Sequence, residues 1–140
     1  MEQLFIEVRG IRGKDFKSLS DYKEDLFGYM KIQKDKIEVE PDKIRTILLY
    51  MNSRCLIDID EDICLIQKNG LELFKKKNKD YGESYKMCGI IGILVRIIDK
   101  INRLDNLNKI RKYEVNDESY QDTLIDLHNY TLLGIMCIDN

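Results

Sequence analysis

Two sets of polar residues in the last third of the chain have the types and the spacing of a binding or catalytic site. The later set lies in the sequence DESYQDTLIDLHNY and consists of Glu118, Asp122, Asp126 and Asn129. Steps of four, four and three residues place these side chains on one face of a helix. Carboxylates one turn apart can share a hard cation such as Mg²⁺, which takes oxygen ligands and keeps several waters. The set therefore predicts a site for Mg²⁺, with Mn²⁺ as the alternative ion. The first-turn Glu118 has a second interpretation, which is to balance the helix dipole.

The earlier set is mixed in charge. It lies in the sequence IIGILVRIIDKINRL and consists of Arg96, Asp99, Lys100 and Arg103, which share one face of a second helix. Asp99 would add a carboxylate to the metal site from a facing helix, and the three bases would bind phosphate. Because Ile, Leu and Val flank both sets, we expect the charges to face inward or into a cleft. The alternative is that the two arginines pair with Asp122 and Asp126 in an internal salt-bridge network that binds no ligand.

A third candidate segment has the sequence KNKDYG and covers residues 77–82. It is predicted to be a loop because Gly82 is a natural place for a helix to stop. Its candidate side chains are Lys77 for phosphate and, together with Asn129, three for the base and the sugar: Asn78, Asp80 and Tyr81. The alternative is an ordinary lysine-rich helix end with a glycine cap.

The single histidine, His128, lies beside the acidic set and not on it. No Ser or Cys stands at a recognisable spacing from it, so the sequence gives no support to nucleophilic catalysis. A P-loop, a GxGxxG motif and an HExxH motif are also absent from the sequence. We therefore expect a neutral histidine, either at the surface or packed in the core.

The composition is that of a globular protein. The 140 residues suffice for one domain with a real core, and 44% apolar with 34% charged residues is typical of a soluble helical protein. A net charge of −2 gives no general attraction to nucleic acid or to an anionic membrane. Four cysteines without a CxxC motif predict reduced thiols and no zinc site. The sequence opens without a signal-peptide pattern, and charges interrupt its longest apolar run, so we expect a cytoplasmic protein.

The first forty residues differ in pattern from the rest. The alternation of Leu4, Ile6 and Val8 predicts a short strand, and Lys36–Glu40 predicts a second strand as its partner. Between them, residues 18–34 are predicted to be helical, with Ser18 and Asp21 placed as a capping box.

From Pro41 onward the spacing of apolar residues predicts four helices. The first begins at Pro41, and its apolar stripe consists of Ile44, Ile47, Leu48, Met51 and Cys55. The others run from about Glu61 to Lys79 with Asp60 as cap, from about Gly89 to Leu107, and from Asn116 or Asp117 onward. The predicted fold is mainly α, a helical bundle of about four core helices with a short N-terminal helix and a small two-stranded β element. With one proline and no Gly/Ser-rich linker, residues 1–140 are expected to form a single domain.

At the candidate residues the chain resembles a known family. The runs FKKKNKDYGESYKMCGIIGILVRIIDKINRLDNL and VNDESYQDTLIDLHNY resemble the nucleotide modification associated domain (type 1). That group is similar to the all-α nucleoside triphosphate pyrophosphohydrolases of the MazG and dimeric dUTPase superfamily. The resemblance covers about Ile63–Cys137. Residues 1–60 carry no strong family signal and are interpreted as an addition to a family-like core of residues 61–140.

The resemblance implies a helical bundle, dimeric or larger, that cleaves a nucleoside triphosphate between its α and β phosphates. In the superfamily, acidic residues on two helices hold Mg²⁺, typically as ExxE on one and ExxD on the other. This chain differs from that pattern. The later helix offers Glu118 and Asp122 as ExxxD and then Asp126, and the earlier one offers Asp99 among bases, with Glu72 as a candidate from the preceding helix.

We therefore expect a Mg²⁺-dependent nucleoside triphosphate pyrophosphohydrolase that yields a monophosphate and pyrophosphate, with Asp99, Asp122 and Asp126 as its catalytic carboxylates. The incomplete first acidic motif favours an alternative, a nucleotide-binding module that sequesters or senses a nucleotide without turnover. A third reading is a structural interaction domain in which both sets form salt bridges. The expected partners are a nucleotide and further copies of the chain, as a homodimer or higher homo-oligomer, with no nucleic acid and no membrane.

Overall fold

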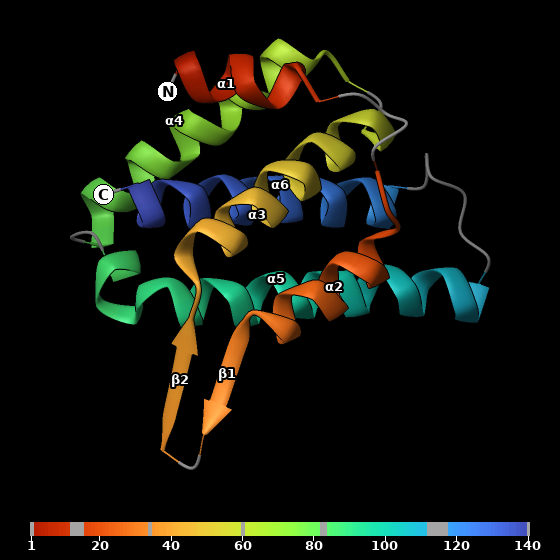
Figure 1. Ribbon diagram of the computed structural model, residues 1–140. Coiled ribbons are helices and arrows are strands. Elements are labelled where there is room, and N and C mark those ends of the chain that lie inside the picture. The colour runs from red at the N-terminus through yellow and green to blue at the C-terminus, as the bar shows by residue number, and fades with distance from the viewer. Residues whose placement is uncertain are drawn as a thin grey trace.

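The computed structural model describes residues 2–11, 16–33, 35–59, 61–81, 84–111 and 118–139. Within these ranges the chain forms six helices and one two-stranded sheet (Figure 1). The bounds are α1 Glu2–Arg9, α2 Leu19–Gly28, β1 Met30–Gln33, β2 Lys36–Val39, α3 Pro41–Asp58, α4 Ile63–Tyr81, α5 Ser84–Arg111 and α6 Glu118–Asp139. The predicted mainly α fold with a small β element is confirmed.

The last helix, α6, lies at the centre of the fold. It packs along α3 and along α5, and it also contacts α4 (Figure 1). The core that these helices share consists of fully buried aliphatic side chains, among them Leu48, Met51, Ile97, Ile101, Leu124 and Leu127. Burying such a side chain stabilises the fold by about 1.5–3 kcal/mol relative to leaving it exposed. No helix in the described ranges is both long and apolar enough to cross a membrane.

A close approach between helices occurs at Gly134 of α6. A Cβ atom at this position would lie 2.7 Å from Leu48 Cδ1 of α3 and 3.4 Å from Ile93 Cγ2 of α5. The missing side chain therefore lets three helices meet at one point, because even a methyl group there would overlap the buried leucine.

The predicted N-terminal strand is wrong. Residues 2–9 form helix α1, in which Leu4 and Val8 are buried while Ile6 is 55% exposed. Leu4 and Val8 are four residues apart, so they also fit one face of a helix, and only the intervening Ile6 suggested a strand. Residues 2–9 form a helix because α1 packs against α3, and this contact buries the stripe made by Leu4 and Val8.

The predicted helix at residues 18–34 ends at Gly28, and the segment after it is strand β1. The predicted strand at Lys36–Glu40 is confirmed as β2, but it pairs with β1 and not with the N-terminus. The pairing is antiparallel, with Met30 opposite Val39 and Gln33 opposite Lys36. Pairing with the nearest segment in sequence closes only a short loop, which minimises the entropy lost.

Two of the predicted helix starts are confirmed locally. Ser18 caps α2, since its Oγ accepts a hydrogen bond of 3.1 Å from the Asp21 backbone N–H, and α3 begins at Pro41. Helix α4 starts two residues later than predicted, with Asp62 Oδ1 accepting from the Leu65 N–H at 3.0 Å. The predicted cap, Asp60, lies outside the described residues.

The predicted helix start at Gly89 corresponds to a break inside α5. The helix extends from Ser84 to Arg111, but Gly89 has φ 65° and ψ −175°. Only glycine adopts this backbone region at little cost, so Gly89 separates a short first piece from the long segment that packs on α6.

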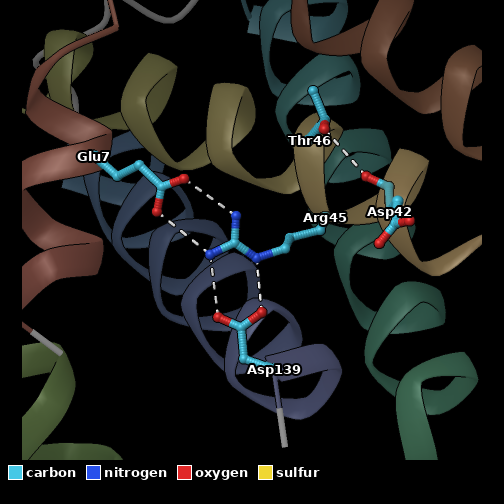
Figure 2. A network of polar contacts seen from close by, with 5 residues as sticks. All are labelled: Glu7, Asp42, Arg45, Thr46 and Asp139. Carbon is cyan, nitrogen blue, oxygen red and sulfur yellow. Dashed lines mark hydrogen bonds and ion pairs between the residues drawn. The ribbon is translucent and has the colours of Figure 1, made fainter.

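Arg45 of α3 ties the two ends of the chain to the bundle (Figure 2). Its guanidinium donates to Asp139 of α6 at 2.7 and 3.1 Å and to Glu7 of α1 at 3.2 and 3.3 Å. The hydrogen bonds to Asp139, and then those to Glu7, raise the pKa of Arg45 above its ordinary value. Because all three side chains are partly exposed, the network fixes the helix geometry more than it adds stability.

Candidate functional site

The two predicted sets meet where α5 and α6 run antiparallel, side by side (Figure 1). Lys100 Nζ lies 3.1 Å from Asp126 Oδ2, and Arg103 Nε donates to Thr123 Oγ1 at 3.2 Å. We call this region the charged seam, and its residues are Arg96, Asp99, Lys100, Arg103, Asp122 and Asp126. The structure thus brings one base of α5 against one acid of α6, while Arg96, Asp99 and Asp122 make no ion pair or hydrogen bond across the two helices within the described residues.

The charged seam lies on the surface of the helix pair, so of the two expected placements the inward-facing one is wrong, and placement in a cleft stays a prediction. Lys100 is half-buried, and the other five side chains are exposed. Each helix buries a different face, with Ile97 and Ile101 on α5 and Leu124 and Leu127 on α6. Apolar residues flank the charges in sequence, but a step of one residue turns a side chain by about 100° away from its neighbour.

The described residues contain no group of three His, Cys, Asp or Glu side chains close enough to hold a metal ion. The side chain of Glu118, one of the four predicted ligands, lies outside the described residues, so the metal site stays a prediction. Asp126 is paired with Lys100, a residue predicted to bind phosphate. Such an exposed ion pair contributes only about 0–1 kcal/mol, so a cation at Asp126 or a phosphate at Lys100 would displace it at little cost.

The predicted loop at residues 77–82 is wrong for its first five residues, because α4 continues to Tyr81. Lysine sustains a helix, and no Gly or Pro interrupts α4 between Gly70 and Tyr81. The side chains of Lys77, Asn78, Asp80 and Tyr81 lie outside the described residues, and their phosphate and base roles stay predictions. Glu72, the further carboxylate candidate, is exposed on α4.

A buried polar layer that was not predicted lies between α3, α4 and α6. We define it by four buried members, Asn52, Gln67, His128 and Thr131, together with the half-buried Asn129. Asn52 Nδ2 donates to the His128 carbonyl and to Thr131 Oγ1, both at 3.0 Å, and Thr131 Oγ1 donates to the same carbonyl at 2.8 Å. These contacts bridge α3 and α6 in the centre of the core. Sequence reasoning missed the layer because isolated polar residues in apolar stretches give no periodic signal.

His128 is packed in the core with no exposed surface, which is one of the two placements that the sequence leaves open. Its Nδ1 lies 2.9 Å from Asn129 Oδ1. Because an amide oxygen only accepts, Nδ1 carries the proton and Nε2 carries a lone pair. Nε2 is buried without a hydrogen-bond partner among the described residues.

Gln67 of α4 has a similar arrangement. Its Oε1 accepts from Arg9 of α1, at 3.0 Å from Nε and 2.6 Å from Nη2. The amide is oriented by this contact, so Nε2 presents its N–H groups to the interior. That nitrogen is the second buried atom without a partner in the described part of the chain.

The environment of His128 predicts a loss of stability in mild acid. Burial lowers the pKa of His128 below its ordinary value, and the hydrogen bond to Asn129 opposes this only in part. Below about pH 6.5 the unfolded chain therefore takes up a proton that the folded chain does not, and the free energy of unfolding falls. Urea denaturation at pH 7.5 and at pH 5.5 measures this change.

The control for that prediction is His128→Phe, which removes the titrating group. Because the chain has one histidine, the excess acid sensitivity of the wild type over the variant belongs to this residue. The excess should grow as the pH falls below about 6.5, by at most about 1.4 kcal/mol per pH unit. Equal pH dependence of the two proteins would show that His128 is not held neutral by the fold.

Comparison with known proteins places this region in context. A family model described as nucleotide modification associated domain 1 matches residues 77–138. The C-terminal segment is similar to this family. The nucleotide modification associated domain 1 match begins near the end of α4 and contains α5 and nearly all of α6. It therefore includes the whole charged seam, His128 and Asn129, and it leaves out α1, α2, the hairpin and α3. No curated protein and no solved structure gave a significant match.

Proposed function

We propose that the charged seam binds the phosphates of a nucleotide and that the chain is a Mg²⁺-dependent nucleoside triphosphate pyrophosphohydrolase. The observation that carries this proposal is the coincidence of the nucleotide modification associated domain 1 match with the helix pair that bears the seam. The resemblance of these helices to the MazG and dimeric dUTPase superfamily supplies the reaction.

The composition of the seam suits this chemistry. Exposed carboxylates of Asp99, Asp122 and Asp126 provide the oxygen ligands that Mg²⁺ takes, with Glu118 as a further ligand. Arg96, Lys100 and Arg103, with Lys77, would neutralise the polyphosphate. The ion would supply Lewis-acid activation of water and of the phosphate.

In the proposed reaction, the oxygen of a water molecule forms a bond to the α-phosphorus, and the bond from that phosphorus to the bridging oxygen breaks. The water proton is accepted by a seam carboxylate, and pyrophosphate leaves with the electron pair. The seam bases would stabilise the negative charge that develops on the leaving group. The Lys100–Asp126 pair would open on binding, which leaves both charges free for their ligands.

A panel of ribo- and deoxynucleoside triphosphates with Mg²⁺ tests the proposal by release of monophosphate and pyrophosphate. Replacement of Asp122 by Asn should lower the rate by about 100-fold or more, since it removes a charge from the reacting centre. The matched control is Glu38→Gln, an exposed carboxylate of β2 and so on neither helix of the charged seam, which should leave the rate unchanged. Absence of both products with every triphosphate would overturn the enzymatic proposal.

The second candidate function is nucleotide binding without turnover. It is favoured by the absence of a three-carboxylate group among the described residues and by the pairing of Asp126 with Lys100. Calorimetry that detects tight binding without product, in the absence of Mg²⁺, would support it. We also propose, from the resemblance alone, a homodimer or larger oligomer, which light scattering measures.

A further inference from the structure

The hairpin of β1 and β2 has outer strand edges to which no further strand is paired. It projects from the helices, and the described part of the chain has no third strand beside it (Figure 1). At its base Met30 is buried and Val39 is half-buried, whereas Ile37, on the same face as Val39, is 39% exposed. Because a two-stranded hairpin is only marginally stable in water, added strands would stabilise it.

The outer edge of β2 presents the backbone groups of Ile37 and Val39. The Glu40 N–H donates to the Tyr29 carbonyl at 3.2 Å, which continues the antiparallel pairing of the two strands. Successive residues of such a strand turn their N–H and C=O groups alternately toward the paired strand and away from it. Glu38 therefore faces β1, as Glu40 does, whereas Ile37 and Val39 face outward. An open edge of this kind is a template for pairing with another chain.

The side chains of β2 are complementary to a second copy of the same strand. When two β2 strands run antiparallel about a two-fold axis at Ile37, Lys36 of each copy lies opposite Glu38 of the other. Opposite charges directly across a strand pair stabilise it, and like charges destabilise it. An axis one residue earlier would place Lys36 opposite Lys36, and an axis one residue later would place Glu38 opposite Glu38. The charges therefore favour the register centred on Ile37, whose backbone groups face outward.

We propose that the β2 strands of two copies of this chain pair antiparallel and join the two hairpins into one four-stranded sheet. On one face the two exposed Ile37 side chains would lie together. On the other face Glu38 would lie between Lys31 of its own hairpin, opposite it in the register, and Lys36 of the second copy. The β1 edge offers no such match, since Lys31 is its only charged residue. Both copies use the same surface, so the assembly closes as a dimer.

This contact goes beyond the proposed function. It gives a surface to the oligomer proposed above, and it lies outside residues 77–138, which the family model matches. It is independent of the proposed reaction, because α5 and α6 of a single chain form the charged seam. Two paired strands of four residues bury less area than a standard interface, so we expect a weak dimer with a Kd of about 10–100 μM.

Charge reversal tests the register, with the dimerisation constant measured by sedimentation equilibrium. Lys36→Glu replaces both attractive pairs by repulsive ones and should weaken dimerisation by about 10- to 100-fold. The hairpin itself should tolerate this change, because its residue opposite Lys36 is the neutral Gln33. The matched control is Lys68→Glu, the same charge change at an exposed lysine of α4, which should keep the wild-type constant.

A second charge variant supplies the complement of the first. Glu38→Lys combined with Lys31→Glu reverses the charge at position 38 and keeps opposite charges across the hairpin. Alone, this variant should also dimerise weakly, because positively charged side chains then face each other. Mixed in equal amounts with Lys36→Glu, it should form a heterodimer of about wild-type affinity, since each acid then lies opposite a base.

Disulfide cross-linking under mild oxidation gives a second measurement of the register. Cα atoms of a hydrogen-bonded antiparallel pair lie about 5.5 Å apart, within the range of a disulfide, so Ile37→Cys should form a covalent dimer. Lys36→Cys should stay at the background of the native cysteines, because the two copies of this position are diagonal neighbours about 7–8 Å apart.

The outcomes separate the inference from the proposed function. A wild type that stays monomeric well above the expected Kd would overturn both the inference and the proposed oligomer, but not the proposed reaction. An oligomer that Lys36→Glu leaves unchanged would overturn the inference alone, since its contact would lie on another surface. A mixture of the two charge variants that does not recover dimerisation would overturn it too, as would equal cross-linking of Ile37→Cys and Lys36→Cys.

Discussion

Replacement of Gly134 by valine is expected to destabilise the protein by about 1–3 kcal/mol, the usual effect of overpacking a dense core. The new Cβ would lie 2.7 Å from Leu48 Cδ1, and Leu48 is fully buried between α3 and α6. A terminal methyl can normally rotate away, but Ile93 and Ile90 also lie close to the new Cβ, at 3.4 and 3.7 Å, and leave it little room. Valine is a better helix former than glycine, so any loss of stability reports packing and not propensity. Chemical denaturation measures it.

Two further variants identify the cause of that loss. Leu48→Ala removes the overlapping methyl groups, and the double variant should be more stable than the sum of the single effects by about 1–2 kcal/mol. Gly28→Val is the matched control, because no atom lies within 4 Å of a Cβ at Gly28. It should change stability by about 0.5 kcal/mol or less. Strict additivity of Gly134→Val and Leu48→Ala would show that the two positions do not compete for space.

Replacement of Asn52 by alanine is expected to lower the free energy of unfolding by about 2–4 kcal/mol. Its amide nitrogen donates to the His128 carbonyl and to the Thr131 hydroxyl, and the side chain is 1% exposed. The variant would leave Thr131 Oγ1 without its donor and would open a cavity between α3 and α6. An unsatisfied buried group costs about 1–3 kcal/mol, and the cavity adds to this. Urea denaturation with an unchanged m value would show that only stability has changed.

The size-matched control is Asn52→Leu, which fills the same volume without the hydrogen bonds. It should avoid the loss of stability that the cavity causes, but it should keep the loss that comes from the missing hydrogen bonds. Thr46→Ala tests a hydroxyl of α3 that is exposed and bonds to the Asp42 carbonyl at 3.1 Å, and it should cost about 0.5 kcal/mol or less. If Asn52→Ala were as mild as Thr46→Ala, the buried polar layer would have no role in holding α3 to α6.

The candidate site could be predicted in part. Regular spacing identified both helices of the charged seam and the residues that face each other across it, because i and i+4 positions share a face in any helix. Whether that face is buried depends on where the neighbouring helices lie, and apolar flanking residues misled the prediction. The pairing of Lys100 with Asp126, rather than of the two arginines with the acids, depends on the axial register of α5 against α6.

The buried polar layer is a second feature that the sequence pattern does not reveal. His128 was predicted to be neutral, at the surface or packed, and only the tertiary structure shows that it is buried, where burial lowers its pKa. Asn52, which donates to the His128 carbonyl, and Gln67, which belongs to the same layer, are far away in the chain, and no motif links them to it. Two unpartnered nitrogens become visible only once α4 and α6 are in contact.

The amino-acid sequence alone determined the helices after Pro41, the cap at Ser18 and the hairpin strand at residues 36–39, because these depend on side chains within one or two turns. It also identified the residues of the charged seam. Tertiary structure determined that residues 2–9 are a helix, since α3 offers a surface that buries Leu4 and Val8 together. It likewise placed the seam at the surface and His128 at the core. On α6, the acidic stripe of the seam and the apolar stripe of the core are offset by only one or two residues in sequence. The packing of α3 and α5 against α6 determines which stripe is covered.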